Sequence, residues 1–296
     1  MAAVTGMNTP TTNANEIPEI WSDLVIKFRE ANLVMRQLVT DRSADLAGGG
    51  DIVHFPVTAS MTAIAYTDGK RLTDNLAANT TGVVDLTVDQ FYFPPVMVQW
   101  TTSALSRYNI KADRMAAAGE SIARKIDATL LALGTNFTAT DINTPAGTAQ
   151  TGDLTLAHIL SAYTTLNAAK VPASDRAWVF HPTAYGELLG LSGNYFISAD
   201  FRSGVPLETG RIGMILGSPV YQSTEVATIS TGSPAETGYM NMYFHKSALG
   251  LAVANEPQIS MSFDEDTMSE LGSVRAAWGV KTLRADHGVV IRTVND

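Results

Sequence analysis

The sequence predicts an α+β fold, and three observations support this class. The longest helical pattern of the chain runs from Ala104 to Gly134. Before it, residues 51–101 show strand patterns and no convincing helix. After it, shorter helical and strand patterns interleave up to the C-terminus. Helices and strands arranged in this order along a chain are typical of α+β proteins.

Composition sets the outer limits of function. The chain has 296 residues, of which 45% are hydrophobic and 17% charged, so we expect one or two domains with a substantial core. It has no cysteine, which excludes disulfides, thiolate catalysis and cysteine-ligated zinc. No apolar run approaches the ~18 residues of a membrane span, and Met1–Asn15 lacks the features of a signal peptide. We therefore expect a soluble protein made in the cytoplasm, with no membrane partner.

Net charge argues against direct binding of nucleic acid. The formal net charge is −9 and the isoelectric point is near 5.0. Proteins that grip phosphates normally carry a clustered excess of lysine and arginine. Any DNA close to this chain would be repelled.

The N-terminal stretch predicts an arm followed by a helix. Residues 1–18 are rich in Thr, Asn and Ala, so they have little to bury and should form an extended arm. Apolar residues at helical spacing then predict a helix over Ile17–Val39. Three glycines, Gly48–Gly50, end this unit as a flexible tether or a hinge, because glycine adopts backbone conformations that other residues avoid.

The stretch from residue 51 to residue 101 predicts a long hairpin. Alternating apolar residues lie in the segment 52–66 and again at Val84, Leu86 and Val88. Residues 67–71, which include Asp68, Lys70 and Arg71, would form its tip. Two strands alone are marginally stable in water, so we expect another element to cover this hairpin, and a neighbouring subunit is the natural candidate.

The central pattern predicts one long amphipathic helix. Its apolar stripe is formed by Met115, Ala118, Ile122, Ile126, Leu130 and Leu133. Asn109 is a plausible N-cap and Gly134 ends the pattern, so a helix of roughly 25 residues would be about 37 Å long. Phe93-Pro94-Pro95 precedes it and predicts a kink before a strand over Val96–Thr102.

The remaining chain predicts shorter elements. They are a loop over Thr135–Asp153, a helix over Leu154–Ala169, a strand over Arg176–His181, a small helix from Pro182 through Leu189, and a loop over Gly190–Gly210. Gly217-Ser218-Pro219-Val220 predicts a turn between apolar strands. Tyr239–His245 and Ala248–Ala254 predict paired strands across a short turn. Strands over Ile259–Phe263, Val274–Arg284 and Val289–Val294 follow.

No catalytic, cofactor or metal site is predicted. The glycines at 210, 213 and 217 lack the context of a nucleotide-binding loop, and the five histidines are scattered singly. The acidic group Asp264, Glu265, Asp266 and Glu270 lacks the ligand spacing of a calcium loop, so a solvated turn is the better interpretation. Lys70 and Arg71 at the hairpin tip are the exposed basic pair that could meet acidic residues of another subunit. A chain without a catalytic constellation more often acts through its surfaces.

The order of these elements resembles the Hong Kong 97 type major capsid proteins of tailed double-stranded DNA bacteriophages. The resemblance spans almost the whole chain and is carried by four stretches: Ser121–Leu130, Trp178–Leu189, Gly213–Val220 and Ala285–Ile291. It implies a fold with an N-arm, an extended β-hairpin loop, a long spine helix in a peripheral domain and an axial α/β domain.

The resemblance also implies how the chain divides. The implied parts are an N-terminal arm and helix at 1–50, the extended loop at 51–101, the spine helix and following loop of the peripheral domain at 102–152, the axial domain at 153–254, and C-terminal strands returning to the peripheral domain at 255–296. Candidate residues for contacts between subunits are Lys70, Arg71, Asp68, Asp264, Glu265, Asp266, Trp21 and Phe28.

By the same resemblance, copies of the chain would assemble as pentamers and hexamers into an icosahedral shell, part of the virion, that encloses double-stranded DNA without binding it specifically. The resemblance implies a portal as a partner. It also implies a separate scaffolding protein, because the chain starts at Met1 without a long helical extension. Subunits of the type member are cross-linked through a loop lysine. Lys70 lies in a similar loop, but we expect non-covalent contacts or a cement protein here.

Two alternatives stay open from the sequence. An encapsulin-like nanocompartment would share the fold and hold cargo enzymes instead of a genome. A soluble α+β enzyme with an unrecognised site would form a small fixed oligomer with a polar pocket.

Overall fold

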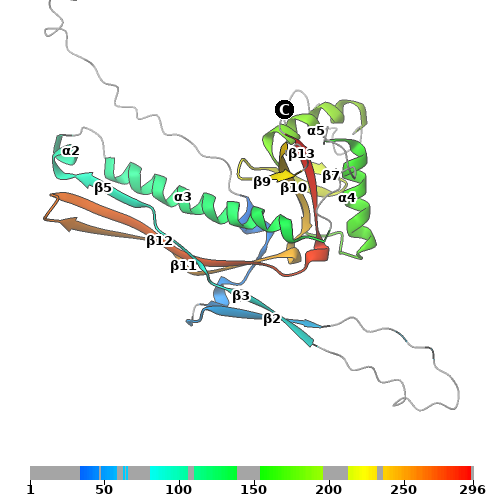
Figure 1. The fold of residues 1–296 in the computed structure, drawn as a ribbon, viewed down its shortest axis with the longest axis horizontal. Helices are drawn as coiled ribbons and strands as arrows, with labels where there is room; N and C mark the ends of the chain where they lie inside the picture. The colour runs from blue at the N-terminus through cyan, green and yellow to red at the C-terminus, as the bar shows by residue number, and fades with distance from the viewer. Residues whose placement is uncertain are drawn as a thin grey trace, which may run out of the picture.

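The chain folds around two β-sheets, as a computed structural model shows for residues 34–46, 48–58, 63, 65, 81–105, 110–138, 154–195, 213–231 and 236–294. Within these residues there are sheets of five, six and two strands. Figure 1 shows the long helix lying along the five-stranded sheet, with the six-stranded sheet at one end. The mixture of helix and strand confirms the predicted α+β class.

The five-stranded sheet is built on one long hairpin. Its strands are β1 (Thr40–Asp41), β4 (Gln90–Tyr92), β5 (Pro95–Gln99), β11 (Leu249–Asp264) and β12 (Ser269–Thr282). β11 and β12 are antiparallel neighbours, β1 runs parallel to β11, and both β4 and β5 pair with β12. The predicted separate strands at 248–254 and 259–263 are therefore one strand, which continues through an irregularity of register between Val253 and Gln258.

The long helix α3 (Ile110–Ala132) is shorter than predicted. It is followed by the 3-10 turn η4 (Leu133–Asn136), and a separate short helix, α2 (Trp100–Leu105), occupies part of the predicted 96–102 strand. The apolar stripe is confirmed, because Met115, Ala118, Ile122, Ile126 and Leu130 are buried. A helix of this length spans about 34 Å. The predicted cap Asn109 lies outside the described residues.

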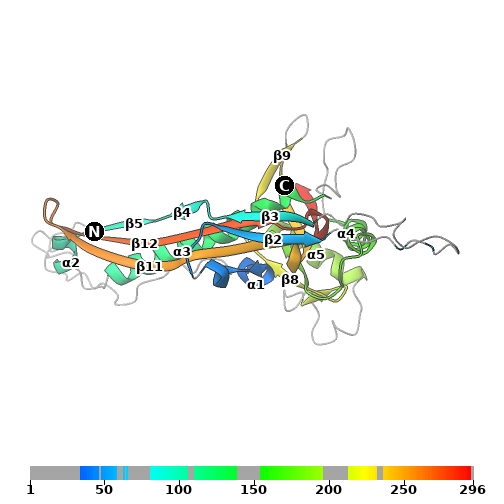
Figure 2. The ribbon, with the colours of Figure 1, turned by 90° about the horizontal axis from the view of Figure 1, so that it is seen from below.

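The extended loop begins as the predicted hairpin. β2 (Ile52–Thr58) and β3 (Thr81–Thr87) are antiparallel, with Ile52 opposite Thr87. Their inward side chains join a small cluster with the long hairpin, made of Leu46, Val53, Leu86, Val88, Ala252 and Ala277. The base of the loop is thus covered by the chain's own sheet, on the face opposite α3 (Figure 2). The predicted tip with Asp68, Lys70 and Arg71 lies outside the described residues.

The six-stranded sheet is buried between helices on one side and α3 on the other. Its strands are β6 (Arg176–Phe180), β7 (Met214–Ile215), β8 (Ser218–Gln222), β9 (Thr228–Thr231), β10 (Glu236–His245) and β13 (Gly288–Val294). Trp178 and Tyr243 point into a core with α4 (Leu156–Ala168) and α5 (Pro182–Tyr195). Met242 and Phe244 point the other way, into the core that contains α3.

Three expectations for this half of the chain need correction. β10 and β11 are consecutive but do not pair, because the 3-10 turn η6 (Lys246–Ala248) carries the chain from one sheet to the other. Residues 255–296 do not all return to the five-stranded sheet, since β13 pairs with β10. The loop predicted from Gly190 starts later, because α5 continues to Tyr195. A turn does join β7 to β8, but it lies at Leu216 and Gly217, which both have positive φ, and residues 218–220 of the predicted turn belong to strand β8.

The described part of the predicted N-terminal helix is short. Of the predicted helix Ile17–Val39, the described part forms only α1 (Met35–Leu38). Val34 has φ −121° and ψ −24°, and the N–H groups of Val34 and Met35 both donate to the Asp127 carboxylate. In a continuous helix these groups would bind carbonyl oxygens four residues earlier, so a helix cannot run unbroken through Val34. Trp21 and Phe28 lie outside the described residues.

Candidate functional site

The described residues offer surfaces and a junction as functional features, and they hold no metal cluster. Among them, no group of three or more histidine, cysteine or acidic residues is arranged to bind a metal ion. None of their helices is long and apolar enough to cross a membrane.

The junction between the two sheets brings together two histidines that looked unrelated in sequence. The chain crosses between the sheets at η6 and again at η7 (Ala285–His287). His245 begins the first crossing and His287 ends the second. The Ser247 hydroxyl lies 2.8 Å from His245 Nδ1 and 2.6 Å from His287 Nδ1. One serine therefore bridges the two crossings, although the histidines are 42 positions apart.

The geometry of this bridge requires a neutral His245. The Ser247 backbone N–H donates to His245 Nδ1 at 3.1 Å, so this ring nitrogen is an acceptor. Burial lowers the pKa of both histidines, and the charge of Asp175 near His245 opposes this only in part. Asp286 likewise raises the pKa of His287, against burial and the Arg284 charge. No pattern in the sequence indicates this pair, because only the two chain crossings bring the histidines together.

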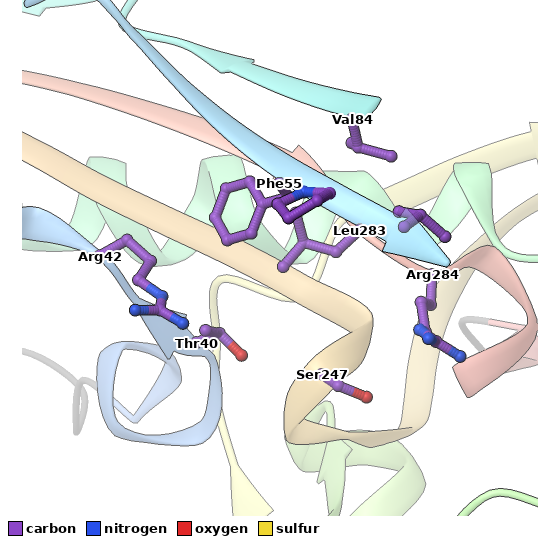
Figure 3. Close-up of a pocket in the computed structure, with 9 residues that line it drawn as sticks. Thr40, Arg42, Phe55, Val84, Ser247, Leu283 and Arg284 are labelled. Carbon is purple, nitrogen blue, oxygen red and sulfur yellow. The ribbon is translucent and has the colours of Figure 1, made fainter. Parts of the chain in front are cut away.

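A pocket opens beside this junction, under the base of the extended loop. Its volume is about 190 Å³, and it is lined by Thr40, Arg42, Phe55, Pro56, Val57, Val84, Ser247, Leu283 and Arg284. Figure 3 shows Phe55 on the side of β2, with Arg42 and Arg284 at opposite ends of the pocket. The two guanidinium groups do not converge on one point, so the pocket lacks the focused charge of an anion site.

The buried carboxylate of Asp127 fixes α1 to the middle of the fold. Asp127 is almost fully buried, and its Oδ2 accepts hydrogen bonds from Val34 N at 2.8 Å and Met35 N at 3.4 Å. Burial raises the pKa of this carboxyl, the two N–H groups lower it, and the nearby charge of Glu225 raises it. Glu225 is itself held by the Arg124 guanidinium at 2.9 Å. The anchor determines where the N-terminal segment leaves the body of the fold.

The acidic turn predicted as a contact candidate lies at the far end of the long hairpin. Asp264 closes it by accepting hydrogen bonds from Asp266 N and the Thr267 hydroxyl, and Glu265 and Asp266 are exposed. Glu270 is separate from this group, because it pairs with Lys111 Nζ at 2.5 Å. The acids thus form a turn closed by its own hydrogen bonds, and their role in subunit contacts stays a prediction. The other candidates, Lys70, Arg71, Asp68, Trp21 and Phe28, lie outside the described residues.

The face of the five-stranded sheet opposite α3 exposes large apolar side chains that sequence reasoning missed. Phe91 is 70% exposed and Met97 is 59% exposed. Leu271, directly opposite Met97, is also exposed. Large apolar side chains that are exposed on one face of a sheet can mark a contact surface, so we regard these three residues, the outer-face patch, as a candidate for one.

Comparisons with known proteins agree on one kind of protein. A family model described as phage capsid protein matches residues 107–292. No curated protein matches the sequence. The fold is similar to a solved structure from Mycobacterium phage Che8, with a TM-score of 0.76 and 24% identity over 93% of this chain and 96% of that chain.

Two more distant structures share the fold over nearly the full length. The capsid structure of the Cyanophage P-SCSP1u has a TM-score of 0.75 and 16% identity, over 99% of this chain and 97% of that chain. A structure from Gordonia phage Cozz has a TM-score of 0.71 and 13% identity, over 99% and 98%. Because the family model matches well over half of the residues, the chain belongs to the phage capsid protein family.

Proposed function

We propose that many copies of this structural capsid protein assemble as pentamers and hexamers into an icosahedral shell that encloses the double-stranded DNA of a tailed phage. Family membership supports a structural role in the virion. The observation on this chain that carries the assembly proposal is the outer-face patch, because an exposed apolar surface on an elongated body needs a cover. In a shell, a second copy supplies that cover, and closed symmetry repeats the contact around every subunit.

The two sheets would take different positions in such a shell. We propose that α3 and the five-stranded sheet form the peripheral domain, and that the six-stranded sheet with α4 and α5 forms the axial domain. The axial tips would meet at the centre of each pentamer or hexamer. The pairing of β13 with β10 supports including β13 in this proposed axial domain.

The shell would have several kinds of partner but no reaction to perform. The net charge of −9 favours a lining that encloses DNA without binding it tightly, which helps packaging and release. A scaffolding protein, a portal and a cement protein are partners that a shell of this family would use during assembly in the host cytoplasm. The encapsulin-like alternative is not favoured, because the family and the similar structures are those of phage capsids.

Electron microscopy with a nuclease test examines this proposal. We expect the expressed chain to form capsomers or closed shells, and particles from the natural source to protect double-stranded DNA from nuclease. Shells that hold protein cargo would instead favour a nanocompartment, and small fixed oligomers in both samples would refute the proposal.

A matched pair of variants tests the outer-face patch. Met97→Glu places a charge in the patch, whereas Met97→Leu keeps its apolar surface and nearly its volume. We expect Met97→Glu to abolish shells while the subunit stays folded by circular dichroism, and Met97→Leu to assemble normally. Normal shells from Met97→Glu would show that the patch is not a subunit contact.

A further inference from the structure

The pocket under the base of the extended loop combines an apolar wall with a cation at each end. Phe55, Val84 and Leu283 are among its apolar lining residues, and Arg42 and Arg284 lie at opposite ends (Figure 3). Its volume of about 190 Å³ is below the roughly 300–1,000 Å³ of typical ligand pockets. The pocket therefore suits one apolar side chain flanked by acidic groups better than a whole small molecule.

Arg284 gives this pocket a charge that the described part of the chain does not balance. Its side chain is exposed and forms no ion pair with any described residue. At the other end, Arg42 Nη1 lies 3.9 Å from Asp45 Oδ2, a long distance for an ion pair. Cations beside an apolar surface favour a partner that carries acidic and apolar groups together.

The turn at the end of the long hairpin has the complementary chemistry. Glu265 and Asp266 are exposed, and their carboxylates form no ion pair with any described residue. Met268 follows them in the same turn and is 56% exposed. One turn between β11 and β12 thus offers two acids and an apolar side chain to a partner.

The backbone of this turn holds Met268 in an unfavourable conformation. Its φ is 48°, in the left-handed region that glycine adopts freely and other residues rarely adopt. The Trp100 N–H donates to the Met268 carbonyl oxygen at 3.1 Å, which ties the turn to α2. Methionine is flexible and fills irregular apolar gaps, so burial of Met268 against another surface would offset this strain.

The hairpin turn cannot reach the pocket of its own chain. The pocket is lined by Leu283, which lies against Gly250 near the start of β11. The turn follows Asp264 at the other end of β11, and a strand from residue 250 to residue 264 is about 46 Å long at 3.3 Å per residue. Figure 1 shows the turn at the end of the sheet, away from β2 and β3. A contact between turn and pocket therefore joins two copies.

We propose that the hairpin turn of one copy docks in the pocket of a second copy, with Met268 against the apolar wall. Glu265 and Asp266 then lie beside the two guanidinium groups, whose separation suits two carboxylates and not a single anion. This contact rests on the proposed self-assembly of the chain and names one interface within it. Because two different surfaces meet, the contact is heterologous and can pass from copy to copy.

Cross-linking between two single-cysteine chains tests the contact, because the chain has no cysteine of its own. One chain carries Glu265→Cys and the other carries Val84→Cys. The two chains are mixed before assembly, treated with a short bis-maleimide, digested and analysed by mass spectrometry. We expect peptides that join position 265 to position 84, and these can come only from two different copies.

Two controls calibrate the yield. Ser161→Cys places the second thiol on the exposed face of α4, away from the pocket lining, and should cross-link to Glu265→Cys at least tenfold less than Val84→Cys does. A chain with both Ser262→Cys and Leu271→Cys, which lie directly opposite each other on β11 and β12, confirms that the reagent works.

Charge reversal identifies the groups that meet. Arg284→Glu, added to the Val84→Cys chain, should lower the cross-link yield several-fold, and Asp266→Arg, added to the Glu265→Cys chain, should restore it. Lys170→Glu changes the net charge equally at an exposed position that does not line the pocket, so it should leave the yield unchanged. A subunit that is merely destabilised would not be rescued by the paired reversal.

Microscopy of the same samples separates this contact from the shell proposal. Closed shells without the cross-link, beside a positive reagent control, would overturn the docking contact alone. The cross-link in open or irregular assemblies would support the contact and count against a closed shell. Chains that stay monomeric would refute both.

Discussion

Gly279 of β12 lies close against the backbone of the extended loop at Thr87, so its replacement should displace the loop. An added Cβ at Gly279 would lie 2.2 Å from the Thr87 carbonyl oxygen and 2.9 Å from a methyl group of Leu86. Contacts below 3.0 Å are essentially never seen for real Cβ atoms. In Gly279→Ala, β3 must therefore move by about 1 Å, and a backbone segment cannot relax as a flexible side chain does.

Gly272 provides the matched control on the same strand. An added Cβ there would overlap the terminal methyl of Met115, which is the far end of a flexible side chain. Met115 can rotate away, so Gly272→Ala should cost less even though the initial overlap is larger. Neither glycine has a positive φ, so backbone strain does not separate the two variants.

The expected loss for Gly279→Ala is about 1–3 kcal/mol, the usual cost of overpacking. At about 2–4 °C per kcal/mol for chains of 150–250 residues, the melting temperature should fall by several degrees. Thermal unfolding of capsomers, followed by circular dichroism, measures this, and microscopy scores assembly. A Gly279→Ala protein as stable as the wild type, or a Gly272→Ala protein that loses more, would refute this account of the loop base.

Two further predictions concern the anchor and the junction. Asp127→Ala should lower the unfolding free energy in urea titrations by about 1–3 kcal/mol, because the Val34 N–H loses its buried acceptor. Asp127→Asn keeps an acceptor oxygen and should lose much less stability. Equal losses in the two variants would contradict this role of Asp127. Lowering the pH should destabilise the protein, because the pKa values of His245 and His287 are lower in the folded than in the unfolded state. The stability that these histidines contribute is complete above about pH 6.5, the unfolded pKa, and is lost as the pH falls through their folded pKa values. The side chain of His245→Asn can still accept a hydrogen bond from the Ser247 N–H but does not titrate. From pH 7.5 to pH 5.5, the stability of this variant should therefore fall less than that of the wild type. An unchanged pH dependence would exclude His245 as a cause.

The sequence patterns identified the parts of the fold that depend on local periodicity. The α3 stripe and the alternation of β2 and β3 were both predicted because each buries one regular row of side chains. A turn that includes Gly217 was predicted from turn-forming residues between apolar strands, and the positive φ of Gly217 is the conformation that favours glycine there.

Long strands with interruptions were harder to predict. β11 spans 16 residues, but Glu256-Pro257 breaks its alternation, and proline in a strand normally signals its end. The strand tolerates Pro257 because its register with β12 shifts between Asn255 and Gln258. At this irregularity, the N–H that proline lacks is not needed for a regular hydrogen bond between the strands. The pattern alone therefore suggested two short strands, and one of them was wrongly paired with β10.

The candidate surfaces were predicted only in part. The acidic turn at Asp264–Asp266 was visible as a run of charges. The outer-face patch was not, because Phe91 and Met97 follow the same alternation as buried residues and only the position of α3 decides which face is covered. The histidine bridge depends on two chain crossings, which no spacing in the sequence reveals.

The shared core limits where copies of this chain can differ from one another in a shell. Val179 and Met242 of the six-stranded sheet pack in one cluster with Val274 and Trp278 of the five-stranded sheet. A rotation between the sheets would break this close-packed core, so we expect the two sheets to move as one body. The extended loop joins this body through Gly48–Gly50, where Gly49 and Gly50 have φ of 92° and 136° and an added Cβ at Gly49 would meet nothing within 4 Å. Differences among symmetry-distinct copies should therefore concentrate in the loop and the N-terminal arm, and superposable loops in every copy of a shell would contradict this.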